Sequence, residues 1–214
     1  MHTTKDTKDA HAEKPAAEKF KQLVEKTRSC RRFNQSAAIS DETLRQLIDT
    51  ARLSGSARNG QPWQYMIINS PQLCERIFPH LGWAGYLRDW KGPEAGERPA
   101  AYVLCLLHRK RLIVSEKDAF HDLGIATQNL LLEATTRQIM GCRIGAFSPE
   151  VKKLFDIPGH LSLELIIALG HPIEQIVLDE MHNTEDIEYW RDEKHIHHVP
   201  KRSLEDILVT LNIR

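Results

Sequence analysis

The segment "TRSCRRF" gathers side chains that could hold an anion. Arg28, Arg31 and Arg32 bring three guanidinium groups, and Ser29 a hydroxyl, within five residues beside the apolar Phe33. Arginine presents planar N–H donors that match the oxygens of a phosphate, so an anion-binding turn is one interpretation of this cluster. The cluster by itself favours the other interpretation, a solvated basic turn, because runs of charge usually lie on the surface.

A second polar group stands in "SGSARNGQPW", residues 54–63, directly after a predicted helix. Ser56, Asn59 and Gln61 offer hydroxyl and amide groups, and the flanking glycines let the backbone approach a ligand closely. An ordinary helix end followed by a turn, stopped by Pro62, explains the glycines equally well. It does not explain the density of amide and hydroxyl groups, which favours a ligand contact.

The stretch "GCRIGAF" carries two glycines four residues apart, Gly141 and Gly145. They either permit tight turning or leave backbone N–H groups free to face a flat ring. The sequence has no G-x-G-x-x-G after a strand and no G-x-x-x-x-G-K-[ST], so neither a Rossmann nor a P-loop nucleotide site is indicated.

Hydrolytic and metal chemistry lack their usual signatures. His195, His197 and His198 form a polar, histidine-rich run, but without a second ligand group at defined spacing it is more typical of a solvated loop, and we expect no metal. No G-x-S-x-G or H-E-x-x-H motif occurs, and Cys142 has no evident histidine partner.

Composition limits the possible partners and the compartment. The 214 residues include 29 basic and 29 acidic side chains, and this balance gives no support to a nucleic-acid or membrane-surface binder. Four scattered cysteines suit reduced thiols better than a disulfide framework. With no apolar stretch of membrane-spanning length and no signal-peptide core, we expect a soluble cytoplasmic protein without nucleic-acid or membrane partners.

Helices and strands must position these candidates. Ser40 is a predicted N-cap, and helices are predicted over residues 117–138 and from "SPEVKKLF", with Ser148 as N-cap and Pro149 as first helical residue. A short helix is predicted in "LCERIFPHL". Strands are predicted at "QYMIIN", "AAYVLCLLH" and "LSLELIIALGHP", whereas "MGCRIGAF" reads as a break. This order predicts an α+β fold with few strands.

The ends of the chain and one internal segment differ from this core. We expect residues 1–18 to form a disordered polar tail, and residues 19–214 a single domain whose C-terminal arm, from about residue 175, ends in a short helix. Trp83, Tyr86 and Trp90 lie in a segment rich in glycine and proline, which is either a lid over a site or an irregular surface loop. We refer to residues 83–90 as the lid segment.

Six segments, in the same order, resemble the FMN-dependent nitroreductase superfamily. The resemblance extends from about residue 20 to the C-terminus. The six segments are "TRSCRRF", "SGSARNGQPWQYMI", "DLGIATQNLLLEA", "GCRIGAF", "ALGHP" and "VPKRSLEDIL". The resemblance implies a central, mostly antiparallel sheet flanked by helices, in an intertwined homodimer with FMN at the subunit interface. It also implies a set of cofactor-binding residues: Arg28, Ser29, Arg31, Ser56, Ala57, Asn59, Gln61, Ile144, Gly145, Ala146, Lys201 and Arg202.

The resemblance assigns these residues to parts of the cofactor. Arg28, Ser29 and Arg31 would hold the phosphate, ribityl chain and ring edge, and Lys201 and Arg202 would close on the phosphate. Residues 56–61 would reach the flavin from the other subunit, and residues 144–146 would pack along the ring. Two departures from the family pattern are Thr27, where many members have arginine, and Gln138–Met140, where many have Gly-Leu-Gly.

The implied activity is reduction of a small electron-poor acceptor, such as a nitroaromatic or quinone, by NADH or NADPH. Hydride would pass through flavin N5, so no protein side chain would act as nucleophile or dedicated base. The absence of hydrolase and metal-binding motifs from the sequence agrees with this. Trp83, Tyr86 and Trp90 would then form a substrate lid. The alternatives are reductive dehalogenation, flavin fragmentation, or flavin binding with negligible turnover.

Overall fold

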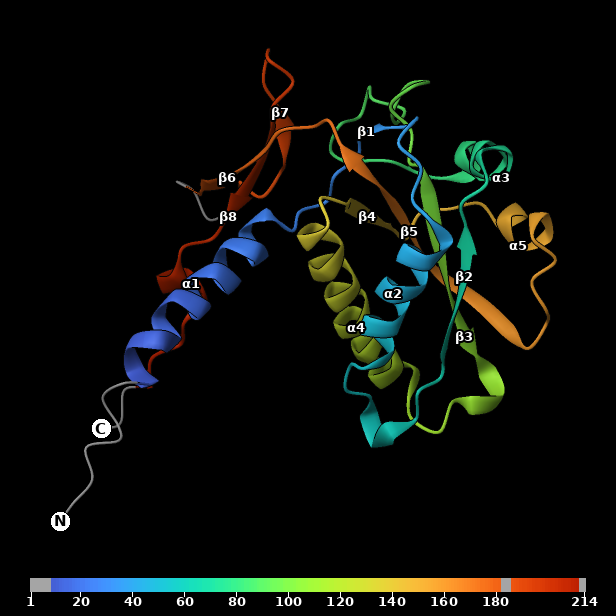
Figure 1. Ribbon diagram of the computed structural model, residues 1–214, viewed down its shortest axis with the longest axis horizontal. Helices are drawn as coiled ribbons and strands as arrows, with labels where there is room; N and C mark the ends of the chain where they lie inside the picture. Colours follow the sequence, from blue (N-terminus) through green and yellow to red (C-terminus); the bar gives the residue numbers. More distant parts are fainter. Residues whose placement is uncertain (1–8, 182–185, 212–214) are drawn as a thin grey trace.

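A long strand, β5 (Leu161–Pro172), is the centre of the main sheet in the computed structural model, which describes residues 9–181 and 186–211 (Figure 1). It pairs antiparallel with β3 (Ala101–His108) on one edge. On its other edge it pairs with β4 (Met140–Ile144) and, at its end, with β1 (Phe33–Asn34). Strand β2 (Trp63–Ile68) completes the sheet by pairing with β3. Every pairing in this sheet is antiparallel.

Helices cover both faces of this sheet. The helices are α1 (Asp9–Lys26), α2 (Asp41–Arg52), α3 (Pro71–Ile77), α4 (Glu116–Thr136), α5 (Glu150–Leu154) and α6 (Leu204–Ile207), with short 3-10 turns at η1 (Ala57–Asn59), η2 (Phe78–His80) and η3 (Arg109–Arg111). In Figure 1, α2 and α4 lie on one side of the strands, and α3 and α5 on the other. The predicted α+β class, with a mostly antiparallel sheet flanked by helices, is confirmed.

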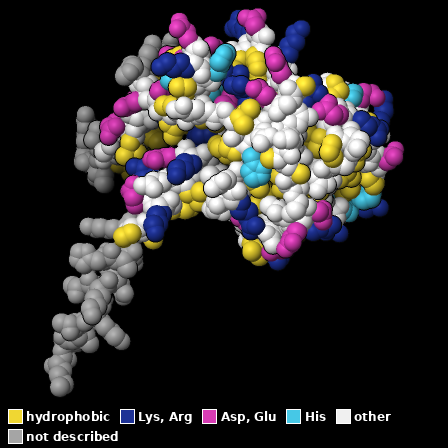
Figure 2. All heavy atoms as spheres, turned by 45° about the horizontal axis from the view of Figure 1, so that its top comes forward, with side chains coloured by type: hydrophobic (Ala, Val, Ile, Leu, Met, Phe, Trp, Pro, Cys, Tyr) yellow, Lys and Arg dark blue, Asp and Glu magenta, His cyan; other side chains and the backbone are white. Residues whose placement is uncertain are grey.

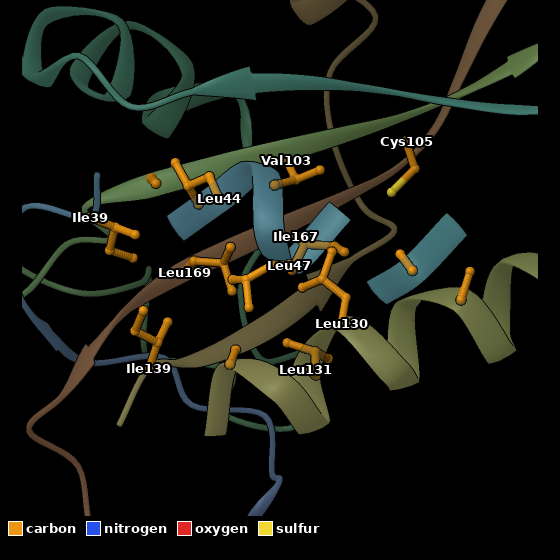
Figure 3. Packing of buried hydrophobic residues seen from close by; sticks show 14 of the residues in the cluster. Ile39, Leu44, Leu47, Val103, Cys105, Leu130, Leu131, Ile139, Ile167 and Leu169 are labelled. Atoms are coloured by element: carbon orange, nitrogen blue, oxygen red, sulfur yellow. The ribbon is translucent and has the colours of Figure 1, made fainter. Parts of the chain in front are cut away.

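Alternation along β3 divides the core in two. Val103 and Cys105 face α2 and α4, where Leu47 and Leu130 join them in one buried cluster (Figure 3). Tyr102, Leu104 and Leu106 face the opposite side and pack in a second cluster with side chains of α3 and α5. Successive strand side chains point to opposite faces, so a strand as apolar as β3 is buried on both.

Local signals explain most of the predicted elements. The Ser40 side chain accepts a hydrogen bond from the Thr43 N–H, as its N-cap role requires. Helix α5 begins one residue later than predicted. Pro149 is its cap residue, and the Ser148 hydroxyl still accepts from the Glu150 N–H at 3.2 Å.

The segment read as a break, "MGCRIGAF", contains strand β4. Gly141 belongs to the strand because a Cβ there would lie 2.6 Å from the Ala168 oxygen and 2.8 Å from a Leu131 methyl carbon. The glycine therefore lets β4 pass close to both β5 and α4. Three residues earlier, Gln138 turns the chain with a φ of 59°. It is the first residue of the segment that departs from the family pattern.

Helix α1 includes residues 9–18, which the sequence placed in a disordered tail; residues 1–8 lie outside the described part of the chain. Six of these ten residues are alanine or glutamate, which favour helix. Thr27 follows the helix, buried, with its Oγ1 2.7 Å from the Leu23 oxygen and 3.0 Å from Thr135 Oγ1. It therefore fastens the end of α1 to α4.

The C-terminal arm contains a second, small sheet that the sequence did not predict. Strand β8 (His197–Lys201) pairs parallel with β6 (Ile176–Glu180) and antiparallel with β7 (Trp190–Arg191). In Figure 1 this small sheet lies beside the end of α1, away from the main strands. Residues of α1 and of β6 line one cavity. The short helix predicted at the end of the arm is α6.

Candidate functional site

A basic cavity of about 290 Å³ lies where the "TRSCRRF" segment meets the arm. Four of its lining residues are cationic, and no acidic residue of the described part of the chain lines it. The lining residues are Thr27, Arg28, Ser29, Arg31, Gln128, Leu131, Arg143, Tyr189, His197, Val199 and Lys201. We call this cavity the anion pocket, because a negatively charged group is the ligand that its charge favours.

Arg31 is buried in the wall of the anion pocket. Its Nη1 donates to the Ser29 carbonyl at 3.2 Å and lies 3.1 Å from His197 Nε2. Its guanidinium carbon lies 4.8 Å from the centre of the Tyr189 ring. The Arg31 backbone N–H donates to the carboxylate of Glu174 at 2.8 Å, which fixes the turn.

Three buried nitrogens of residues that line this pocket have no hydrogen-bond partner among the described residues. They are Nδ1 of His197 and, as certain donors, the Nε–H groups of Arg28 and Arg31. Arg28 uses its Nη2 to donate to the Val24 carbonyl at 2.7 Å, at the end of α1. Because an unpaired buried donor carries a desolvation cost, both groups fit an anionic ligand that would accept from them.

Arg143 adds a cation that the sequence reasoning did not assign to the site. It lies on β4, where its Nε donates to Thr127 Oγ1 at 2.8 Å and its Nη2 to Gln128 Oε1 at 2.9 Å. Burial lowers the pKa of Arg143 from its usual value, and the group remains charged at neutral pH. Its position between two glycines, Gly141 and Gly145, was the available signal.

A second cavity, of about 280 Å³, adjoins the anion pocket, and Arg31, Arg143 and Tyr189 line both. The other residues of its lining are Gly82, Trp83, Ala84, Gly85, Cys142, Ile144, Gly145 and Ala146. A Cβ on Gly145 would meet no atom within 4 Å, so this glycine leaves one wall open. We call this second space the flat cavity, after the flat ring that we expect from the sequence beside residues 144–146. The predicted ring-packing residues 144–146 all lie here.

The lid segment borders the flat cavity. Trp83 lines it, and the buried Nε1–H of this indole has no partner in the described chain. Tyr86 packs edge-on against Tyr189, with ring centres 4.9 Å apart. The Trp90 ring lies under the guanidinium of Arg191, whose carbon is 4.2 Å from the ring centre. The three predicted lid aromatics therefore lie along one segment, but only Trp83 lines the cavity.

The "SGSARNGQPW" turn lies elsewhere, at a third cavity of about 240 Å³. Asp122, on α4, fixes this turn by accepting from the Ser56 hydroxyl at 2.7 Å and from the Ala57 N–H at 3.0 Å. Gln61 Nε2 donates to Asn59 Oδ1 at 2.8 Å. Ser56 and Gln61 line the cavity, and Asn59 and Gln61 are exposed.

One chain does not bring the two predicted halves of the site together. Asp122 holds the turn from one part of α4, and Leu131 reaches the anion pocket nine residues further along the helix, a rise of about 14 Å. In Figure 1 the turn after α2 lies at the lower end of α4, and the "TRSCRRF" segment passes its upper end. Of the two basic residues predicted from the arm, Lys201 lines the anion pocket, whereas Arg202 is exposed and is not among its lining residues.

The histidine run divides between interior and surface. His197 is buried beside Arg31, and His198 stacks on Trp190 with ring centres 4.1 Å apart. His195 is exposed. In the part of the chain that the structure describes, no group of three or more His, Cys, Asp or Glu side chains is arranged to hold a metal ion.

The four cysteines are free and buried. Burial raises the pKa of the thiols of Cys30 and Cys105 to about 12 and that of Cys74 to about 11, and it also raises the pKa of Cys142. These thiols therefore stay protonated at neutral pH, which argues against nucleophilic catalysis by cysteine.

His197 gives the fold a pH dependence. Burial and then the nearby Arg31 guanidinium lower the pKa of His197 from 6.5 to about 4. As the pH falls below 6.5, the unfolded chain binds a proton that the folded chain does not, so stability is lost, by about 3 kcal/mol once the pH is below 4. His197→Gln keeps an acceptor for Arg31 and is expected to reduce this loss, measured by urea unfolding at about pH 7.5 and about pH 4.5.

The exposed His195 provides the control for that experiment. His195→Gln should leave the difference in unfolding free energy between the two pH values as in the wild type. An equal loss of stability in wild type and His197→Gln would show that other groups cause the acid sensitivity.

Acidic and basic side chains are interspersed over the face seen in Figure 2, in keeping with their equal numbers. Among the described residues, no helix combines the length and apolar character needed to cross a membrane.

Comparison with solved structures matches this fold. A nitroreductase family protein from Clostridium novyi NT superposes with a TM-score of 0.59 at 25% identity, covering 72% of this chain and 86% of that chain. A structure from Desulfovibrio desulfuricans, described as a nitroreductase in complex with FMN, gives a TM-score of 0.62 at 22% identity, covering 91% of this chain and 98% of that chain.

Comparison with curated proteins agrees. A protein of Methanothermobacter thermautotrophicus, provisionally named NADH dehydrogenase/NAD(P)H nitroreductase, is 25% identical over 154 residues, covering 70% of this chain and 75% of that protein. Iodotyrosine deiodinase of Thermotoga neapolitana is 27% identical over 176 residues, covering 70% of this chain and 87% of that protein. The family model described as "Nitroreductase family" matches residues 24–171, most of the chain, and the chain therefore belongs to the nitroreductase family.

Proposed function

We propose that the protein is an FMN-dependent oxidoreductase that uses NADH or NADPH to reduce a small electron-poor acceptor of the nitroaromatic or quinone type. The observation that carries this proposal is a pocket lined by four cations and, among the described residues, by no acidic side chain, which shares three lining residues with a second cavity. A phosphate attached to a planar ring system needs an anion site and, beside it, a space for the ring.

The residues present fit FMN. The unpaired Nε–H groups of Arg28 and Arg31 and the unpaired Trp83 Nε1–H are buried donors that a ligand would satisfy. Names of relatives support the same cofactor, since the Desulfovibrio desulfuricans structure is described as a complex with FMN. The Methanothermobacter relative carries NAD(P)H in its name, which supports a nicotinamide reductant.

When bound, FMN supplies hydride exchange between a nicotinamide and an acceptor, and the protein's part is binding, orientation and exclusion of water. Arg28, Arg31, Arg143 and Lys201 would neutralise the phosphate. Arg31 can only donate, so His197 Nε2 must accept from it, and the proton of the neutral imidazole lies on Nδ1. His197 thus orients the guanidinium without adding charge.

We further propose that the site is completed by a second copy of the chain. The turn held by Asp122 carries Ser56, Ala57, Asn59 and Gln61, and in a homodimer it would reach the flavin of its partner. Apolar side chains exposed on α1, α4 and the C-terminal segment support such an association. They include Phe20, Phe120, Ile125, Leu204, Ile207, Leu208, Val209 and Leu211.

A complementation experiment tests the shared site. Asn59 has a φ of 54°, so Asn59→Gly removes the amide without backbone strain, and it is expected to weaken FMN retention without unfolding the protein. Chains carrying Asn59→Gly, co-expressed with chains carrying Arg31→Met under two affinity tags, should yield heterodimers with one intact site. Flavin content of half the wild-type value supports the proposal, whereas flavin-free heterodimers place both residues in one chain's site.

Stopped-flow mixing tests the activity. Flavin-loaded protein should bleach rapidly with NADH or NADPH and recover its flavin absorption when a quinone is added. Protein that remains colourless after FMN is added would contradict the proposed cofactor, and loaded protein that bleaches with neither nucleotide would favour flavin binding with negligible turnover.

Reductive dehalogenation is the second candidate, favoured by the similarity to iodotyrosine deiodinase over 87% of that relative. Halide release from an iodophenol by the pre-reduced protein distinguishes the two activities. Faster reoxidation by the iodophenol than by quinones and nitroaromatics would favour the dehalogenase.

A further inference from the structure

Tyr189, in the C-terminal arm, forms part of the wall between the two cavities. It is a lining residue of both the anion pocket and the flat cavity. Its ring packs beside His197 at 5.2 Å between centres, with the Arg31 guanidinium 4.8 Å away. Arg31 and His197, which contact this ring on the side of the anion pocket, are themselves buried.

The same tyrosine contacts the lid segment. Its hydroxyl oxygen accepts a long hydrogen bond, 3.4 Å, from the Tyr86 backbone N–H, and the two rings meet edge to face at 4.9 Å. Among the described residues, the backbone hydrogen bonds of the lid segment join near neighbours, Leu87 to Ala84 and Trp90 to Leu87. Contact with Tyr189 therefore links the middle of this segment to the site.

A second contact runs in parallel through Arg191. Its guanidinium covers the Trp90 ring at 4.2 Å, and its Nη2 forms an ion pair with the buried carboxylate of Glu174. Glu174 also accepts from the Arg31 backbone N–H. The arm thus joins the turn of the anion pocket to two points of the lid segment, Tyr86 and Trp90.

The ends of the lid segment are fastened differently. At its start, the Gly82 N–H donates to the Ala146 carbonyl at 2.7 Å. Beyond its end, the carboxylate of Glu97 makes two hydrogen bonds to Arg32, at 2.6 and 2.7 Å. Both ends are therefore fixed to the main body, and the position of the middle depends on the arm.

We propose that Tyr189 is a positioning residue that holds the lid segment beside the flat cavity and so determines which acceptors fit there. This inference rests on the proposed function, because it concerns the acceptor of that reaction. The acceptor class it favours is planar and aromatic, since Tyr189 and Trp83 both present rings to the same cavity.

Hydrogen exchange of the holoprotein tests the positioning directly. In Tyr189→Ala, amides of residues 83–90 should exchange about two- to tenfold faster than in the wild type, the range expected for the loss of one aromatic pair. Tyr189→Phe keeps the ring and should show a smaller increase. The matched control is Trp190→Ala, because Trp190 adjoins Tyr189 in sequence but stacks on His198 and is about half exposed, at 48%.

Acceptor kinetics at saturating FMN test the consequence. Tyr189→Ala should raise KM for menadione by about two- to tenfold relative to p-benzoquinone, with kcat nearly unchanged, and Trp190→Ala should leave this ratio as in the wild type. Unchanged exchange in residues 83–90, or an equal increase in Trp190→Ala, would overturn the proposal. If Tyr189→Ala does not fold, the same comparison with Tyr189→Phe decides.

The two proposals fail in different ways. A wild-type holoprotein that reduces no acceptor would refute the proposed activity and with it the acceptor selection. The exchange comparison would still show whether Tyr189 holds the lid segment.

Discussion

Replacing Arg31 by methionine is expected to weaken FMN binding by about ten- to a hundredfold while leaving riboflavin binding almost unchanged. Hydrogen bonds to a charged group contribute about 1.5–3 kcal/mol, which corresponds to this range. Riboflavin differs from FMN only by lacking the phosphate. Because the buried guanidinium faces the anion pocket, its loss should be felt mainly by the ligand that carries the phosphate.

The neighbouring arginine is a matched control for this experiment. Arg32 pairs with Glu97 through two hydrogen bonds and is not a lining residue of the anion pocket, so Arg32→Met should retain the preference for FMN over riboflavin. Both affinities can be measured by quenching of flavin fluorescence. Equal weakening of FMN and riboflavin in Arg31→Met would show that Arg31 acts through the fold and not through the phosphate.

Gly145→Val is expected to abolish flavin retention while the protein stays folded. A Cβ at this position meets no atom within 4 Å, and the backbone is not in the left-handed region, so the fold should tolerate a side chain. The isopropyl group would instead occupy part of the flat cavity of about 280 Å³. The flavin-to-protein absorbance ratio after gel filtration measures retention, and the unfolding free energy should change by about 0.5 kcal/mol or less.

Gly159→Val provides the comparison. A Cβ on Gly159 also meets no atom within 4 Å, but this glycine belongs to the loop before β5 and does not line the flat cavity. Its flavin content should match the wild type. Full flavin content in Gly145→Val would show that the ring of the cofactor does not occupy the flat cavity.

The sequence predicts the main elements where local signals are strong. Ser40 caps α2 as expected, and the apolar runs of β2, β3 and β5 are continuous enough to be recognised as strands. Strand β4 was not predicted, because its glycine is a turn signal unless the close approach of Ala168 and Leu131 is known. The arm strands were not predicted either, because each is short and they pair with one another instead of with the main sheet.

The candidate site shows the same division. Clustering in sequence identifies Arg28, Ser29 and Arg31, since the turn brings neighbours together. Arg143 and His197 reach the anion pocket from β4 and β8, and no local pattern reports such a meeting of distant segments. Thr27 stands where many family members have arginine, and the structure gives it another role, because its side chain joins α1 to α4. Arg143 supplies a cation to the same pocket.

The central place of β5 in the sheet has a consequence for synthesis of the chain. Strands β1, β3 and β4 all pair with it, although it begins only at Leu161. About three quarters of the polypeptide must therefore be synthesised before the sheet can form completely. Until then, the edge of the apolar β3 that pairs with β5 has no partner strand. The anion-binding turn waits still longer, because the backbone N–H of Arg31 finds its carboxylate 143 residues later, at Glu174. This order of strands along the chain predicts that expression depends on chaperones and that chains truncated before β5 aggregate.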